Sequence, residues 1–172
     1  GVADIDIAQA EDAASSIGDG HMAIEMDVTD PAAVQAGIEA VIERFGRIDV
    51  LLSNAGVQMV KPVEAFEYDE WRKVIAIHLD GAFLTSKAVL PHMYRQGGGT
   101  ILFMGSVHSL EASALKAPYV SAKHGLLGLA RVIAIEGGDK GVRSNVICPG
   151  FVRTPLVDKQ IPEQAQDLGI SE

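Results

Sequence analysis

Tyr119 and Lys123 are the residues whose types and spacing point most directly to chemistry. They lie four residues apart in a segment, 119–136, whose apolar residues recur at helical intervals. Both side chains are therefore expected on one face of a largely buried helix. A phenol is a poor base at neutral pH, and a nearby cation favours the phenolate. The pair predicts a tyrosine that can accept and donate a proton, although a Tyr four residues before a Lys is also common on ordinary helix surfaces.

Ser106 stands where a second catalytic group would be needed. It follows an apolar run, 100–105, that is typical of a buried parallel strand. Such a strand brings the residues at its C-terminal end to a site. A hydroxyl there can donate a hydrogen bond to a developing oxyanion.

A serine at a strand end followed by a Tyr-x-x-x-Lys helix resembles the layout of the short-chain dehydrogenase/reductase family, from Gly1 to about Gln160. The resemblance implies that Tyr119 is the acid/base and that Ser106 stabilises the reacting oxygen. It also implies that Lys123 lowers the pKa of Tyr119 and holds the nicotinamide ribose. This chemistry needs no metal.

Strands, turns and helices alternate along the chain, which predicts an α/β fold: a Rossmann-type, doubly wound parallel sheet in a three-layer αβα sandwich. Residues 1–172 are expected to form a single dinucleotide-binding and catalytic domain. Compared with the family pattern, this domain is expected to be incomplete at both ends. The first strand, with its glycine-rich turn, is missing before Val2, and the last strand is missing after Gln160. Loss of that central first strand would leave the sheet split. Helices are predicted at 8–17, 31–45, 70–96 and 119–136, and strands near 1–6, 21–28, 48–54, 100–106 and 142–150.

Composition narrows the class of partner and the expected location. A net charge of −9 argues against nucleic acid and anionic membrane surfaces. A single cysteine, Cys148, rules out an internal disulfide, and its apolar neighbours predict a buried side chain. No run of eighteen apolar residues and no basic-then-apolar leader is present, so a cytoplasmic protein is expected.

The cofactor is predicted to be NAD. An acid at the end of a strand can bind the adenosine ribose hydroxyls and repel the extra phosphate of NADP, and Asp4 is that candidate, with Asp6 second. An ordinary surface acid is an equally good interpretation of Asp4 from its local sequence. The family's Asn-Asn-Ala-Gly turn has Ser53 at its first position here. The cofactor-binding residues that the resemblance implies are Asp27, Val28, Asn54, Ala55, Gly56, Tyr119, Lys123, Pro149, Gly150, Val152 and Thr154.

His78 is the residue that departs most from the family pattern. Family members usually have Asn there, at a helix irregularity that holds a water on the proton path to the lysine. Histidine can donate and accept hydrogen bonds and titrates near neutrality, so it could keep this relay. Burial for packing alone is the competing interpretation.

Four polar residues resemble the carboxylate pocket of the family's 3-hydroxybutyrate dehydrogenases. They are Gln58, His108, Lys116 and Gln160, and with Ser106 and Tyr119 they would bind a small hydroxy or keto acid. The alternatives are a 3-oxoacyl carrier-protein reductase or another short-chain alcohol dehydrogenase, and a dinucleotide-binding protein without turnover.

A homotetramer is the oligomeric state that the resemblance implies. The helices bearing His78 and Tyr119 would form its interfaces. The sequence is compatible with this, because Leu126, Leu127 and Leu129 lie on successive sides of one helix, more than a single core face requires.

Overall fold

The computed structural model describes residues 1–150, 152, 158, 161, 162 and 165. Strands and helices alternate in it, as the sequence pattern predicts. The strands are β1 (Val2–Asp4), β2 (Ala23–Glu25), β3 (Val50–Ser53), β4 (Gly99–Met104) and β5 (Val142–Ile147). The α-helices are α1 (Ile7–Ile17), α2 (Pro31–Phe45), α3 (Tyr68–Ile75), α4 (Gly81–Arg95) and α5 (Ala117–Gly137), and a π-helical turn, Ala76–Asp80, joins α3 to α4.

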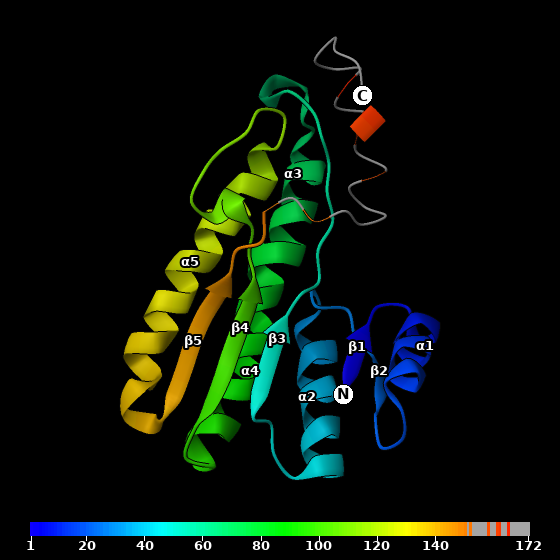
Figure 1. Cartoon of the computed structure of the whole chain (residues 1–172), viewed down its shortest axis with the longest axis vertical. Coiled ribbons are helices and arrows are strands. Elements are labelled where there is room, and N and C mark those ends of the chain that lie inside the picture. Colours follow the sequence, from blue (N-terminus) through cyan, green and yellow to red (C-terminus); the bar gives the residue numbers. More distant parts are fainter. Residues whose placement is uncertain (151, 153–157, 159–160, 163–164, 166–172) are drawn as a thin grey trace.

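Every strand pair among the described residues is parallel. β4 lies between β3 and β5, and two of its side chains, Ile101 and Phe103, are completely buried. β1 pairs with β2 in a separate two-stranded sheet. The described strands therefore form two sheets, which is the split that the sequence predicted (Figure 1).

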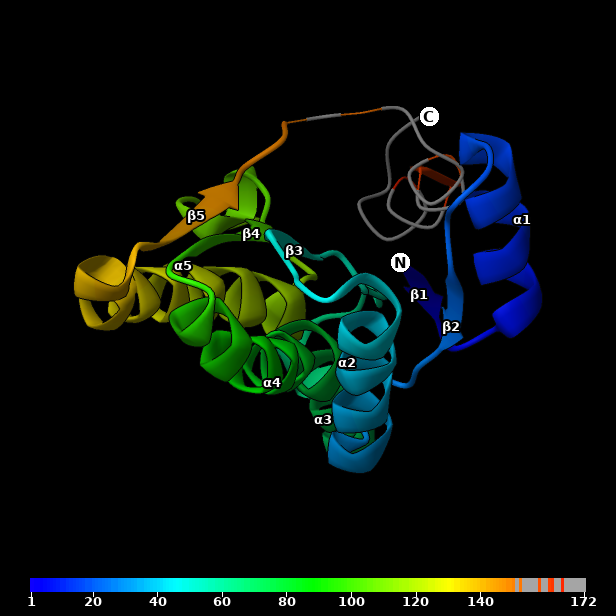
Figure 2. The ribbon, with the colours of Figure 1, turned by 90° about the horizontal axis from the view of Figure 1, so that it is seen from below.

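The helices lie on both sides of the strands. Figure 2 shows α2, α3, α4 and α5 on one side, and α1 on the opposite side of β1 and β2. The outer face of the three-stranded sheet stays open in this part of the chain, where Val50, Leu52 and Ile147 are exposed. The α/β class and the doubly wound arrangement agree with the prediction.

The long helix predicted at 70–96 is present from Tyr68 to Arg95, with the π-turn in its middle. By length and composition this stretch could cross a membrane, which sequence analysis did not predict. However, 44% of its most apolar window is buried within the fold. Its buried side chains Ala82, Val89 and Met93 belong to the hydrophobic core, so the apolar composition already has an explanation.

Local residue chemistry sets the ends of the helices near the site. Asp30 caps α2 by accepting a hydrogen bond from the amide of Ala32, and Pro31 occupies the first turn. One prediction about a strand end is wrong: Cys148 is exposed, not buried. The described part of the chain pairs β5 only with β4, and Cys148 follows the last residue of β5, so no neighbouring strand covers it.

Candidate active site

The catalytic residues predicted from sequence come from the end of β4 and the start of α5. Ser106 follows β4 and opens a short 3-10 turn, Val107–Ser109, that packs against α5. Tyr119 and Lys123 lie on the first two turns of α5. The Lys123 ammonium lies 5.3 Å from the centre of the Tyr119 ring and donates a hydrogen bond of 2.5 Å to the carbonyl of Met104. The helix and the strand end are thus joined at the site.

Lys123 is buried, with 4% of its surface exposed. Burial lowers the pKa of its ammonium to about 8, while the nearby Cys148 acts in the opposite direction. The side chain therefore remains largely a cation at neutral pH. A cation held in a poorly solvated place acts strongly on its neighbours, and the closest ring is that of Tyr119.

His78 lies in the π-helical turn with 5% of its surface exposed. Its Nε2 lies 2.7 Å from the carbonyl oxygen and 3.0 Å from the amide nitrogen of Val57. A neutral ring can satisfy one of these two groups with Nε2, and its Nδ1 is buried without a partner in the described part of the chain. The ring also meets Tyr119 edge-on, with centroids 5.3 Å apart.

The sequence prediction that His78 titrates near neutrality is wrong. Burial, together with the Lys123 cation, lowers the pKa of His78 to about 4. The ring is therefore neutral in the physiological range. This removes an acid–base role near pH 7 but leaves a hydrogen-bonding role for Nδ1.

Gly56 gives the His78 ring its space. A Cβ at residue 56 would lie 2.5 Å from Cε1 of His78, which is closer than side-chain atoms approach. The glycine of the Asn54-Ala55-Gly56 turn thus serves the catalytic side as well as the cofactor side. Sequence reasoning missed Val57 and Met104, because both act through backbone atoms and no side-chain signal marks them.

Three predicted site residues have unsatisfied polar groups: the substrate residues Gln58 and His108, and His78 of the proton path. Buried polar atoms without a partner among the described residues are Gln58 Oε1, His78 Nδ1, His108 Nδ1 and Ser144 Oγ, so three of these four belong to predicted site residues. Buried polar groups normally have partners, and orphaned ones at a site point to a polar ligand. The His108 ring lies 6.1 Å from that of Tyr119.

Lys116 adds a buried charge to this group. It is 9% exposed, and no ion-pair partner is found for it in the described part of the chain. Burial lowers the pKa of Lys116, and burial followed by the Lys116 charge lowers that of His108. An ammonium in this position favours an anion beside it. Gln160 lies outside the described residues.

The sheet is split between β1 and β3, and a groove of about 810 Å³ along this split is lined by part of the predicted cofactor set. This groove brings together one predicted set: Asp4, Asp27, Val28, Asn54, Ala55 and Gly56. The Asp27 carboxylate already accepts hydrogen bonds from the amide and hydroxyl of Thr29, at 2.8 and 2.7 Å. The acid at the end of β1 and the small residues after β3 fit an adenosine and its ribose.

Among the predicted nicotinamide residues, Pro149 is joined to the residue after Ser106. The Pro149 carbonyl accepts a hydrogen bond of 2.9 Å from the amide of Val107, which holds the turn after β5 against the turn after β4. Gly150 and Val152 are exposed, and Thr154 lies outside the described residues.

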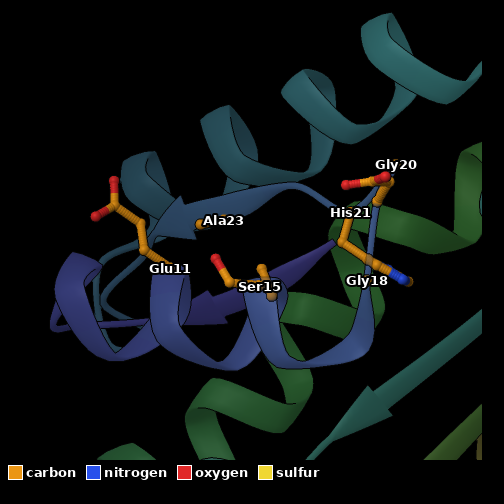
Figure 3. A pocket seen from close by; sticks show the side chains of 8 residues that line it. Glu11, Ser15, Gly18, Gly20, His21 and Ala23 are labelled. Carbon is orange, nitrogen blue, oxygen red and sulfur yellow. The ribbon is translucent and has the colours of Figure 1, made fainter.

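A second hollow, of about 370 Å³, lies away from these residues between α1 and the start of β2 (Figure 3). Its lining includes Glu11, Ser15, Asp19 and His21, and none of the predicted site residues. It therefore plays no part in the site described above.

Comparison with known proteins agrees with this geometry. The sequence model for short chain dehydrogenases matches residues 2–165. The chain is 44% identical to D-beta-hydroxybutyrate dehydrogenase of Rhizobium meliloti, over 85% of this chain and 57% of that protein. It is 41% identical to the protein of the same name from Cupriavidus necator, over 99% and 66%. The chain thus spans 57–66% of the length of these curated relatives.

Relatives with other substrates in their names also match. One is a 3-oxoacyl-(acyl-carrier-protein) reductase of Thermotoga maritima, 32% identical over 85% of this chain and 59% of that protein. Among solved structures, a gluconate 5-dehydrogenase from Burkholderia cenocepacia in complex with NADP and tartrate superposes with a TM-score of 0.87. It is 32% identical, and the match covers 96% of this chain and 66% of that one. The parallel sheet flanked by helices is common to both.

The burial of His78 predicts a specific pH dependence of stability. Its ordinary pKa is 6.5 and its pKa in the fold is about 4. Between these values the unfolded chain binds a proton that the folded chain does not, so stability falls as the pH falls through this window. We expect the free energy of unfolding to fall between pH 7 and pH 4 in both the parent and His78→Asn. The decrease should be about 2–3 kcal/mol larger in the parent.

Chemical denaturation at a series of pH values measures this difference. The exposed His21 supplies the matched control, and His21→Asn should follow the parent curve. Parallel curves for the parent and His78→Asn would contradict the burial argument.

Proposed function

Because the chain belongs to the short-chain dehydrogenase/reductase family, we propose that it is an NAD-dependent oxidoreductase that interconverts 3-hydroxybutyrate and acetoacetate. The observation that carries the proposal is a buried ammonium, Lys116, that has no partner among the described residues and acts electrostatically on the unsatisfied His108; Gln58 also has an unsatisfied polar atom. Removing an ion from water costs several kcal/mol unless an opposite charge compensates. A substrate carboxylate would provide that charge, and amide and imidazole groups would complete its hydrogen bonds.

The proposed mechanism assigns one task to each catalytic side chain. Tyr119, as phenolate, removes the proton of the C3 hydroxyl, and Ser106 donates a hydrogen bond to the same oxygen. Lys123 stabilises the phenolate by its charge and would hold the nicotinamide ribose. A bound nicotinamide would supply the hydride chemistry at C3 of the substrate, in either direction. In the direction of reduction, Tyr119 gives its proton back to the oxygen.

His78 acts in this proposal as a neutral member of the proton path. Its Nδ1, which has no partner among the described residues, would bind a water molecule that exchanges protons near Lys123 and Tyr119. The same function in other family members falls to an Asn, so Asn should substitute for His78. Replacement by Ala should lower kcat about tenfold, and replacement by Asn should restore it. An Ala variant with the kcat of the parent would leave His78 a packing role alone.

A carrier-protein reductase is the second candidate function. It is favoured by the relative of that name, which is 32% identical to this chain. Both functions use a Ser-Tyr-Lys set. The buried cation at Lys116 supports the small acid, because a thioester substrate carries no carboxylate to neutralise it.

Predicted preference for NAD depends on Asp4. The solved gluconate 5-dehydrogenase is in complex with NADP, so a protein with a similar fold binds that cofactor. Asp4 lies at the end of β1 and lines the groove, where its carboxylate would repel a ribose phosphate. We expect Asp4→Asn to lower the ratio of kcat/KM for NAD to that for NADP at least about tenfold. Glu25, exposed at the end of β2, gives a control in Glu25→Gln, which should leave the ratio unchanged.

A homotetramer in the cytoplasm is the proposed state of the complete protein. Exposed apolar side chains on α4 and α5 support it: Phe83, Val132 and Ile135 are 49, 50 and 82% exposed. Single exposed apolar residues are common on protein surfaces. These three lie on the two helices that the family resemblance implies as subunit interfaces. Ile135→Lys should shift the sedimentation coefficient toward a smaller species, whereas Ile17→Lys on α1 should not. A parent protein that sediments as a monomer would refute the tetramer.

The carboxylate pocket is tested with one acid and one neutral substrate. We expect Lys116→Met to raise KM for 3-hydroxybutyrate about 10- to 100-fold, because a charge-assisted contact is lost. KM for methyl 3-hydroxybutyrate, whose ester is uncharged, should change little. Tyr119→Phe should abolish turnover of both. Equal effects of Lys116→Met on the two substrates would contradict the pocket.

A further inference from the structure

Leu115, the residue before Lys116, has an unusual backbone. Its φ is +67°, and among the described non-glycine residues it alone has a positive φ. This left-handed region is disfavoured for residues with a Cβ, and leucine lacks the short polar side chain that lets Asn and Asp adopt it. A conformation of this kind persists where its surroundings impose it, and it is concentrated at functional sites.

Contacts on both sides of Leu115 hold this conformation. Its carbonyl accepts a hydrogen bond of 2.9 Å from the amide of Lys61, in the segment that follows β3. The Lys61 ammonium in turn forms an ion pair of 2.5 Å with Glu70 on α3. On the other side, the Lys116 carbonyl accepts the first hydrogen bond of α5, 2.8 Å from the amide of Val120. The residue is therefore fixed between two segments.

The left-handed turn marks the point where the chain passes from the surface to the site. Residues 111–114 are all exposed, whereas Lys116 is 9% exposed. The two segments joined by the Lys61–Leu115 hydrogen bond also carry Gln58 and Lys116, the amide and the ammonium of the predicted pocket. This hydrogen bond therefore joins the segment that carries Gln58 directly to the residue before Lys116.

We propose that the left-handed turn at Leu115, held by Lys61, is a positioning element that directs the Lys116 ammonium into the site beside His108 and sets the preference for a short acid over its neutral ester. The proposal rests on the proposed function for the identity of the acid. The claim that the backbone conformation at Leu115 keeps the Lys116 side chain buried does not depend on the proposed function.

Substitutions that separate backbone from side chain test the proposal in the complete protein. Leu115→Val makes the left-handed conformation harder to adopt, whereas Leu115→Gly and Leu115→Asn tolerate it. We expect Leu115→Val to raise KM for 3-hydroxybutyrate about tenfold, with KM for methyl 3-hydroxybutyrate and both kcat values within about twofold of the parent. The Gly and Asn variants should keep the parent's KM for the acid within about threefold. Leu110→Val, in the same loop at a negative φ, is the matched control and should change nothing.

A second readout does not depend on the substrate. The rate at which a water-soluble acylating reagent modifies Lys116, followed by peptide mass spectrometry, should rise several-fold in Leu115→Val and stay near the parent's in the Gly and Asn variants. Parent-like labelling in the Val variant would overturn the proposal, as would a raised KM for both substrates or loss of acid preference in the Asn variant. If the Val variant cannot be purified folded, retained acid preference and slow labelling in the Asn variant support the proposal. A parent protein without acid preference would refute the proposed function instead, and the labelling would still decide the role of Leu115.

Discussion

The site depends first on the hydrogen bond from the Lys123 ammonium to the carbonyl of Met104. This bond connects the first turns of α5 to the last residue of β4, and therefore fixes Tyr119 relative to the strand end that Ser106 follows. The lysine can make it only by leaving water, which lowers its pKa to about 8. Burying the Lys123 ammonium costs folding stability, and it places a cation beside the tyrosine ring. Such a cost in stability is common at functional sites.

The sequence was most informative where side chains carry the signal. Helical spacing predicted that Tyr119 and Lys123 share a face of α5, and an apolar run predicted that β4 ends before Ser106. The bond between His78 and Val57, the close approach of Gly56 and the left-handed turn at Leu115 were not predictable. Each depends on backbone atoms brought together by tertiary packing, and no residue type specifies them locally.

Two errors have the same physical origin. His78 was expected to titrate near neutrality and Cys148 to be buried, and both expectations were drawn from residue type and neighbours in sequence. Burial is a property of the whole fold: the π-turn places His78 under the segment after β3, and the end of β5 leaves Cys148 uncovered. The position of a residue within its strand or helix thus decided its environment more than its apolar neighbours did.

The contrast between the net charge of the chain and the charge of the site would affect how the proposed acid substrate arrives. The chain carries a net charge of −9, while Lys116 and Lys123 are buried cations within the site. At long range an anion meets repulsion, and attraction begins only within a few ångströms of the pocket. Dissolved salt screens the long-range repulsion over about 8–10 Å, and it screens the attraction by the buried lysines much less. Moderate ionic strength therefore speeds the encounter with an acid while leaving its bound state largely intact, the reverse of what a uniformly basic binding surface would do.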